Sequence, residues 1–278
     1  MQSKNASLKQ RIITALVLVP IVVGAILYFP SWLFAVMLAI FVAVGAYEWA
    51  RLIGLPSSRR RGYVVALLFS LVPLWWLSDA LVGLRVVLLL ALIWWVLAGM
   101  WVFRYPVSAT AWRGHIWRQC LFGFLILVPA WAALVALHRH GEQGPWLILL
   151  LMLLIWGADS GAYFAGRKWG KDKLAPRVSP GKSWQGLWGG ILTSGLVVLI
   201  FGRLFPIHVE FELYFITVCL VTVLFSVIGD LVESMFKRQA GVKDSGALLP
   251  GHGGALDRID SLTAAAPVFA LATLGVCL

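Results

Sequence analysis

Two pairs of carboxylates near the C-terminal end of the sequence are the residues best suited to chemistry. Asp230 and Glu233 lie at the end of one apolar run, and Asp257 and Asp260 lie at the start of the next. Residues three apart share a helix face, and the Gly-rich segment 234–260 is long enough to bring both faces together. Clustered carboxylates repel one another unless a cation lies between them, and their oxygens suit Mg²⁺. The pattern predicts a site for one or two Mg²⁺ ions serving a phosphoryl-type displacement.

Basic residues accompany these carboxylates in the same segment. Lys237 and Arg238 follow the first pair, Lys243 lies in the intervening loop, and Arg258 lies within the second pair. Their density favours a site for phosphate groups. The alternative is a set of ordinary ion pairs, such as Lys237 with the glutamate four residues before it. His252, between two glycines, fits a general base, a phosphate donor or a turn residue equally well.

A second basic segment, residues 167–186, contains six Lys and Arg residues and the turn sequence Ser-Pro-Gly-Lys-Ser at 179–183. It is not a P-loop, because Pro176 stands where that motif requires glycine. Lys182 and Ser183 open the next apolar run, where helix N–H groups favour a bound anion. The segment therefore predicts contacts with a triphosphate or an anionic lipid head group, or else it serves only membrane topology.

Asp159 lies inside an apolar run, between Gly157 and Gly161. An ionisable residue within a membrane helix is costly and is by default functional. The two glycines form a small-residue face that lets another helix approach closely. The stretch therefore predicts either a functional carboxylate or a helix-packing seam with a satisfied aspartate.

The elements that must position these residues are membrane helices. Hydrophobic residues make up 61% of the 278 residues and charged residues 13%, against roughly 25% charged in soluble domains. A soluble domain of this size cannot bury so much apolar surface. The apolar runs predict an all-α, polytopic membrane protein with about nine transmembrane helices, near residues 11–29, 32–50, 63–78, 84–103, 119–137, 146–166, 187–205, 213–233 and 261–278.

The basic residues predict the orientation of these helices. Of the 23 Lys and Arg residues, all except Arg85, Arg139 and Arg203 fall on one side if the N-terminus is cytoplasmic. Nine helices then leave the C-terminus outside. Topology and phosphate binding together account for the formal net charge of +11, so we expect no nucleic-acid partner.

The composition changes halfway along the chain. Residues 1–145 contain three of the 12 carboxylates and predict an N-terminal transmembrane scaffold of about five helices. Residues 146–278 contain the other carboxylates within about four helices and two cytoplasmic loops, 167–186 and 234–260. We therefore expect the catalytic region in this second half.

The segment 234–260 closely resembles the signature of the phosphatidate cytidylyltransferase (CDP-diacylglycerol synthase) family. The matching positions are Ser234, Lys237, Arg238, Lys243, Asp244, Pro250, His252, Gly253, Gly254, Asp257, Arg258 and Asp260. Stretches at 159–163 and 179–184 also resemble the family, so that the likeness covers residues 150–278. Gln185 departs from the pattern, because many members have Glu there, and is a weak candidate for metal ligation.

The resemblance implies transfer of CMP from CTP to phosphatidate, giving CDP-diacylglycerol and pyrophosphate. It implies Mg²⁺ as a cofactor, with K⁺ as an additional cation. The metal ligands it implies are Asp230 and Asp257, with Asp159, Glu233 and Asp260 in or near the same shell. The other catalytic or substrate-binding residues it implies are Ser179, Lys182, Ser183, Lys237, Arg238, Lys243, Asp244, His252 and Arg258.

The resemblance also implies a homodimer in the bacterial inner (cytoplasmic) membrane, with its active site facing the cytoplasm. Two other functions remain as alternatives. A CTP-dependent lipid-alcohol kinase would transfer the γ-phosphoryl group instead. A cation-coupled transporter would require carboxylates near mid-membrane and two similar halves, whereas the carboxylates gather at one edge and the halves differ.

Overall fold

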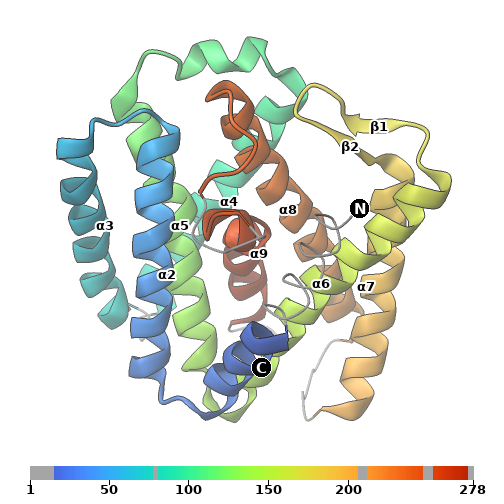
Figure 1. Cartoon of the computed structure of the whole chain (residues 1–278). Coiled ribbons are helices and arrows are strands. Elements are labelled where there is room, and N and C mark those ends of the chain that lie inside the picture. The colour runs from blue at the N-terminus through green and yellow to red at the C-terminus, as the bar shows by residue number, and fades with distance from the viewer. Residues whose placement is uncertain (1–15, 78–80, 206–211, 247–252, 275–278) are drawn as a thin grey trace.

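The computed structural model describes residues 16–77, 81–205, 212–246 and 253–274, and these residues are mainly helical (Figure 1). A short helix, Leu16–Tyr28, precedes eight longer ones. The longer helices are α2 (Ser31–Leu52), α3 (Ser57–Leu77), α4 (Leu81–Arg104), α5 (Ile116–His138), α6 (Gly144–Trp169), α7 (Trp184–Leu204), α8 (Glu212–Gln239) and α9 (Leu256–Thr273). Two single 3₁₀ turns, Val107–Ala111 and Gly141–Gln143, flank α5.

Six of the described helices, namely α2 and α4 to α8, are long and apolar enough to cross a membrane. This confirms the prediction of a helical, polytopic membrane protein. Helices α3 and α9 also lie where spans were expected, but both begin with charged residues and are less apolar. The count of nine spans and the orientation of the termini therefore stay predictions.

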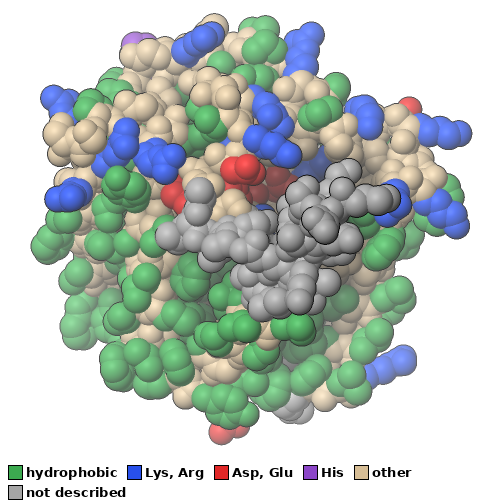
Figure 2. Space-filling view, in the orientation of Figure 1, with side chains coloured by type: hydrophobic (Ala, Val, Ile, Leu, Met, Phe, Trp, Pro, Cys, Tyr) green, Lys and Arg blue, Asp and Glu red, His purple; other side chains and the backbone are tan. Residues whose placement is uncertain are grey.

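Figure 2 shows how charge is distributed over one face of the molecule. Lys and Arg side chains gather at one end, and most of the flank below them is hydrophobic. Acidic side chains appear in a recess just below this basic rim. Such a surface suits a protein that keeps one charged end in water and its flanks in lipid.

Helix α5 lies at the centre of the molecule and packs against α2, α3 and α9 (Figure 1). Its second half, from Pro129 to His138, is buried throughout. Aromatic rings connect the helices near the charged end. Trp49 of α2 contacts Phe236 of α8, and Phe122 of α5 contacts Trp94 of α4. These contacts hold the end of α8, which carries the predicted site, against the first half of the chain.

Helices α6 and α7 form a close pair beside this core (Figure 1). A Cβ atom added at Gly161 would lie 2.6 Å from the Gly189 carbonyl oxygen, and one added at Gly157 would lie 3.1 Å from Val197 Cγ2. The backbones can approach this closely only because Cβ atoms are absent at the contact. The packing seam predicted around Gly157 and Gly161 is therefore confirmed.

The loop between α6 and α7 contains a structure that the sequence did not predict. Strands β1 (Lys173–Ala175) and β2 (Ser179–Ser183) form a small antiparallel hairpin at the charged end of the molecule (Figure 1). Lys173 pairs with Ser183, and Ala175 pairs with Ser179. Because β2 runs directly into α7, the hairpin gives Lys182 a fixed position at the head of that helix.

Candidate active site

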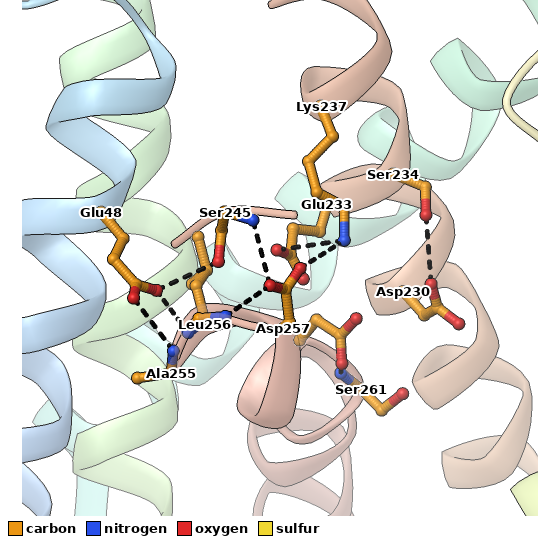
Figure 3. A network of polar contacts seen from close by, with 12 residues as sticks. Glu48, Asp230, Glu233, Ser234, Lys237, Ser245, Ala255, Leu256, Asp257 and Ser261 are labelled. Carbon is orange, nitrogen blue, oxygen red and sulfur yellow. Dashed lines mark hydrogen bonds and ion pairs between the residues drawn. The ribbon is translucent and has the colours of Figure 1, made fainter. Parts of the chain in front are cut away.

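Lys237, near the end of α8, lies between two carboxylates from different helices (Figure 3). Its Nζ atom lies 2.6 Å from Asp257 Oδ1 and 3.4 Å from Glu233 Oε1. Glu233 lies one turn earlier in α8, whereas Asp257 lies in the first turn of α9. The ordinary i,i+4 pair that the sequence allowed is therefore present, but a second carboxylate extends it. Segment 234–260 does bring the two acidic helix ends together.

The backbone of the preceding loop fixes Asp257. Its Oδ2 atom accepts hydrogen bonds from the N–H groups of Ser245, at 3.0 Å, and Gly254, at 2.8 Å. Gly253 has a φ of +82°, and a Cβ there would lie 2.7 Å from the same oxygen, so the turn requires glycine. Burial raises the pKa of Asp257, but Lys237 and the two N–H groups outweigh it and hold this pKa below its ordinary value.

Asp230 meets the basic hairpin. Its Oδ2 atom lies 2.7 Å from Lys182 Nζ, and its Oδ1 atom accepts a hydrogen bond of 3.2 Å from Ser234 Oγ. Asp159, from the apolar helix α6, interacts electrostatically with both Lys182 and Asp230. Three separate elements, α6, β2 and α8, therefore contribute charged groups to one place.

Two further carboxyl groups of the cluster, those of Glu233 and Asp260, are buried. Both carboxylate oxygens of Glu233 are buried, and they lie beside Lys237 and the carboxyl group of Asp260. Burial, and after it the charge of Asp230, raises the pKa of Asp260 to about 7. Among the described residues, Lys182 pairs with Asp230, and Lys237 pairs with Glu233 and Asp257, whereas no ion pair is found for Asp159 or Asp260.

The donor chemistry of this cluster fits Mg²⁺. This ion usually takes one or two carboxylates from the protein and completes its shell with water and substrate phosphates. Asp230 and Asp257 supply such oxygens, and Glu233 lies beside them as the ion-pair partner of Lys237. Across the described ranges, no three His, Cys, Asp or Glu side chains are arranged to hold a metal ion by themselves. The described side chains by themselves therefore do not form a complete metal site.

An apolar cavity of about 350 Å³ opens beside the cluster. Asp159, Asp257, Arg258 and Asp260 line its polar part. Aliphatic and aromatic side chains from the first helix, α2, α5 and α6 form the remaining walls. A cavity with charged groups at one end and apolar walls elsewhere suits an amphiphilic ligand with an anionic head group.

Glu48, from α2, is a residue of this region that sequence reasoning assigned only to the scaffold. Its side chain is 4% exposed and accepts hydrogen bonds from Ser245 Oγ and from the N–H groups of Ala255 and Leu256, at 2.8–3.1 Å (Figure 3). Glu48 thereby caps the start of α9 from another helix. A signal was available, because an ionisable residue inside a predicted span is by default functional.

Other predicted residues lie outside the central cluster. Arg238 Nε donates to the Val178 carbonyl oxygen, which ties α8 to the hairpin. The Ser183 hydroxyl accepts from Gly186 N–H and caps α7, so its observed role is structural. Lys243 and Asp244 are exposed in the loop after α8, and Ser179 lies in β2. His252 lies outside the described residues.

Gln185, the weak candidate for metal ligation, points into the hairpin. Its Oε1 atom accepts from the N–H groups of Lys171 and Asp172, and its Nε2 atom donates to Asp172 Oδ2 at 2.7 Å. The amide therefore closes the base of the hairpin. No contact with the carboxylate cluster is found for it within the described residues.

The chain matches the cytidylyltransferase family over residues 9–274. It belongs to this family. The phosphatidate cytidylyltransferase of Pseudomonas aeruginosa is 50% identical, over 95% of this chain and 96% of that protein. The phosphatidate cytidylyltransferase of Haemophilus influenzae is 41% identical, over 94% and 97% of the two chains. That of Brucella melitensis is 35% identical, over 96% and 93%.

Membership of the cytidylyltransferase family confirms the resemblance seen in the sequence and the enzyme class, a nucleotidyltransferase. The match extends well beyond residues 150–278, where the resemblance was found, and includes the first half of the chain. The region that matches the family therefore includes both the carboxylate cluster and α2, the helix that carries Glu48.

Proposed function

We propose that this cytidylyltransferase transfers CMP from CTP to phosphatidate, giving CDP-diacylglycerol and pyrophosphate. The observation that carries the proposal is an apolar cavity whose polar end is lined by carboxylates and Arg258, with Lys237 paired to one of these carboxylates, Asp257. A phosphate on two acyl chains requires cationic groups beside apolar walls, and this cavity combines the two. The names of the three relatives agree with this substrate pair.

The reaction places modest demands on acid–base chemistry. A phosphate oxygen of phosphatidate is already anionic at neutral pH, so it needs little help from a general base. It attacks the α-phosphorus of CTP and forms the new P–O bond, while the bond to the β-phosphate oxygen breaks and pyrophosphate leaves. The protein must therefore hold two anions in line and offset their repulsion.

The lysines are well placed for that task. Lys237 is fixed by carboxylates on two sides, so its charge is positioned before the substrate arrives. Lys182 brings a second positive charge from the hairpin, and Arg258 lines the cavity where the lipid phosphate would lie. Fixed charges in a site with apolar walls act more strongly than charges in water.

The carboxylates complete the proposed site. Asp230 and Asp257 would hold Mg²⁺, as one or two ions, with Asp159, Glu233 and Asp260 around them. Bound there, Mg²⁺ would supply positive charge to the phosphate oxygens. K⁺ is proposed as an additional cation on the family resemblance alone. The residues proposed to contact substrate besides the lysines are Ser179, Ser183, Arg238, Lys243, Asp244 and His252.

We also propose nine transmembrane helices, with a cytoplasmic N-terminus, an outside C-terminus and an active site open to the cytoplasm. The gathering of basic side chains at the end that carries the cluster supports this orientation (Figure 2). A bacterial inner membrane and a homodimer are proposed on the resemblance to the family. Cysteine labelling from each side of the membrane at Gly202 and Gly62, replaced one at a time, tests the orientation.

One assay tests the reaction against its alternatives. Purified protein in mixed micelles of detergent and phosphatidate is given Mg²⁺ and CTP labelled at either the α- or the γ-phosphorus. The proposal expects α-label in the lipid and γ-label in pyrophosphate. A γ-label in the lipid would indicate a kinase. Absence of label from the lipid in both cases would contradict nucleotidyl transfer to phosphatidate.

A further inference from the structure

A second cavity, of about 410 Å³, lies beside the cluster but is distinct from the apolar one. Its lining comes from the end of α2 and the residues after it, the start of α5, the end of α8, and Val242, Asp244 and Ser245. Two glutamines, Gln119 and Gln239, belong to this lining together with Arg51 at the end of α2. The cavity is therefore polar, unlike the cavity proposed for the lipid.

Trp112 fixes the orientation of both amides. Its indole N–H donates a hydrogen bond of 2.5 Å to Gln239 Oε1, and its carbonyl oxygen accepts one of 3.3 Å from Gln119 Nε2. Trp112 itself is fully buried, and the Gln119 side chain is only 7% exposed. The two amides therefore cannot exchange their oxygen and nitrogen atoms by rotation without losing these hydrogen bonds.

Each amide keeps one polar atom for a ligand. Gln119 Oε1 accepts no hydrogen bond, and Gln239 Nε2 donates none, among the residues that the structure describes. Gln239 is half-buried, and both glutamines line the cavity, so a ligand or water that enters it can satisfy these two atoms. The cavity thus presents one acceptor and one donor in fixed positions.

We propose that this cavity binds the cytosine base of the nucleotide, which rests on the proposed use of CTP. Cytosine offers an amino donor at N4 next to an acceptor at N3, which complements Gln119 Oε1 and Gln239 Nε2. Uracil in the same pose would face these two atoms with a carbonyl at C4 and an N–H at N3, so both contacts would be lost. A site built to hydrogen-bond its ligand rejects an analogue that leaves its polar groups unpaired.

The position of the cavity fits this role. Ser245 lines it, and the N–H of Ser245 donates to Asp257, which also lines the apolar cavity. The nucleotide and the lipid would therefore reach Asp257 from two different cavities. Arg51, exposed at this second cavity, adds positive charge where an anionic nucleotide would enter.

Two conservative variants test the base site in the mixed-micelle assay with Mg²⁺. Gln239→Glu keeps the acceptor for the Trp112 indole but replaces the free donor by an acceptor. We expect KM for CTP to rise about tenfold with little change in kcat, and the CTP-to-UTP ratio of kcat/KM to fall. Gln119→Met removes the free acceptor at similar side-chain length, and we expect the same pattern with a smaller rise in KM.

The control is Gln143→Glu, the same change in the 3₁₀ turn at the opposite end of α5. It should keep the kinetic constants of the wild type, and thermal melting in detergent should confirm that all three variants are folded. Unchanged KM for CTP and an unchanged CTP-to-UTP ratio in both cavity variants would overturn the base site. A fall in kcat alone would overturn it as well. Wild-type protein that uses no CTP would instead contradict the proposed function.

Discussion

The end of α2 and the end of α8 each bury a glutamate, but the two side chains have opposite surroundings. Glu48 of α2 receives three hydrogen bonds, from Ser245 and from the first N–H groups of α9. Glu233 of α8 is equally buried, at 4% exposed, and its neighbours within the described residues are Lys237, an ion-pair partner at 3.4 Å, and the carboxyl group of Asp260. Both carboxylates lie near Asp257, which connects the two regions.

The difference separates two uses of a buried negative charge. A carboxylate that receives several N–H groups at a helix start stabilises the arrangement of two elements. A carboxylate without hydrogen-bond donors costs folding free energy, and proteins keep such groups mainly where charge is needed for binding or chemistry. We therefore assign positioning to the α2 region and cation or phosphate chemistry to the α8 region.

The largest effect is expected at Asp257, which belongs to both regions. Asp257→Asn removes the charge that faces Lys237, and we expect kcat/KM for CMP transfer to fall about 10²–10³-fold. The measurement is the mixed-micelle assay with labelled CTP. Glu142→Gln, at an exposed position in the 3₁₀ turn before α6, is the matched control. Near wild-type turnover in Asp257→Asn would contradict the whole assignment of the cluster.

Removing the satisfied glutamate should cost stability. Glu48→Ala leaves the hydroxyl of Ser245 and two N–H groups of α9 buried without an acceptor, and we expect a loss of about 3 kcal/mol. Thermal unfolding in detergent should show a clearly lower midpoint. Glu48→Gln keeps one acceptor oxygen, so its free energy of unfolding should fall less than that of Glu48→Ala. An unchanged midpoint in Glu48→Ala would show that these hydrogen bonds do not stabilise the start of α9.

The fit around Glu48 can be tested without changing its charge. A Cβ added at Gly254 would lie 2.5 Å from Glu48 Oε2. Gly254→Ala should therefore displace the carboxylate and destabilise the protein by about 1–3 kcal/mol. Gly195→Ala is the control, because a Cβ there meets nothing within 4 Å. Equal melting temperatures of the two variants would mean that the loop before α9 can shift to accommodate the added methyl group without loss of stability.

The smallest change in stability is expected for the unsatisfied glutamate. Glu233→Gln replaces a buried carboxyl group that receives no backbone N–H by a neutral amide of the same shape. We therefore expect the free energy of unfolding to change by less than about 1 kcal/mol. Activity should fall about tenfold, and the Mg²⁺ concentration for half-maximal rate should rise. A loss of stability as large as that of Glu48→Ala, with activity and Mg²⁺ dependence retained, would reverse the two assignments.

Much of the site follows from local sequence patterns. Apolar length located the helices, because a membrane-spanning helix needs about 20 apolar residues. The i,i+3 spacing of Asp230 with Glu233 and of Asp257 with Asp260 placed each pair on one helix face. The glycines at 157 and 161 predicted a seam because close backbone approach excludes Cβ atoms. Each of these inferences depends on residues within one continuous helical segment.

The rest depends on contacts between distant segments. Glu48 is separated from Ala255 by 207 residues, and no local pattern connects the two. The hairpin was predicted only as part of a cytoplasmic loop, because its strands are three and five residues long and carry no clear alternation of apolar and polar residues. The pairing of Lys182 with Asp230 and the pairing of Gln119 and Gln239 through Trp112 likewise required the packed structure.

The link between Glu48 and α9 has a consequence for how the protein is made. Helix α2 is synthesised early, but the donors that satisfy its glutamate are 197–208 residues further along the chain. During synthesis and membrane insertion, the hydrogen bonds of this carboxylate therefore cannot form until almost the whole polypeptide has been made. Ribosome-bound chains ending before α9 should retain a Glu48 that a water-soluble carbodiimide modifies, and release of the full chain should protect it.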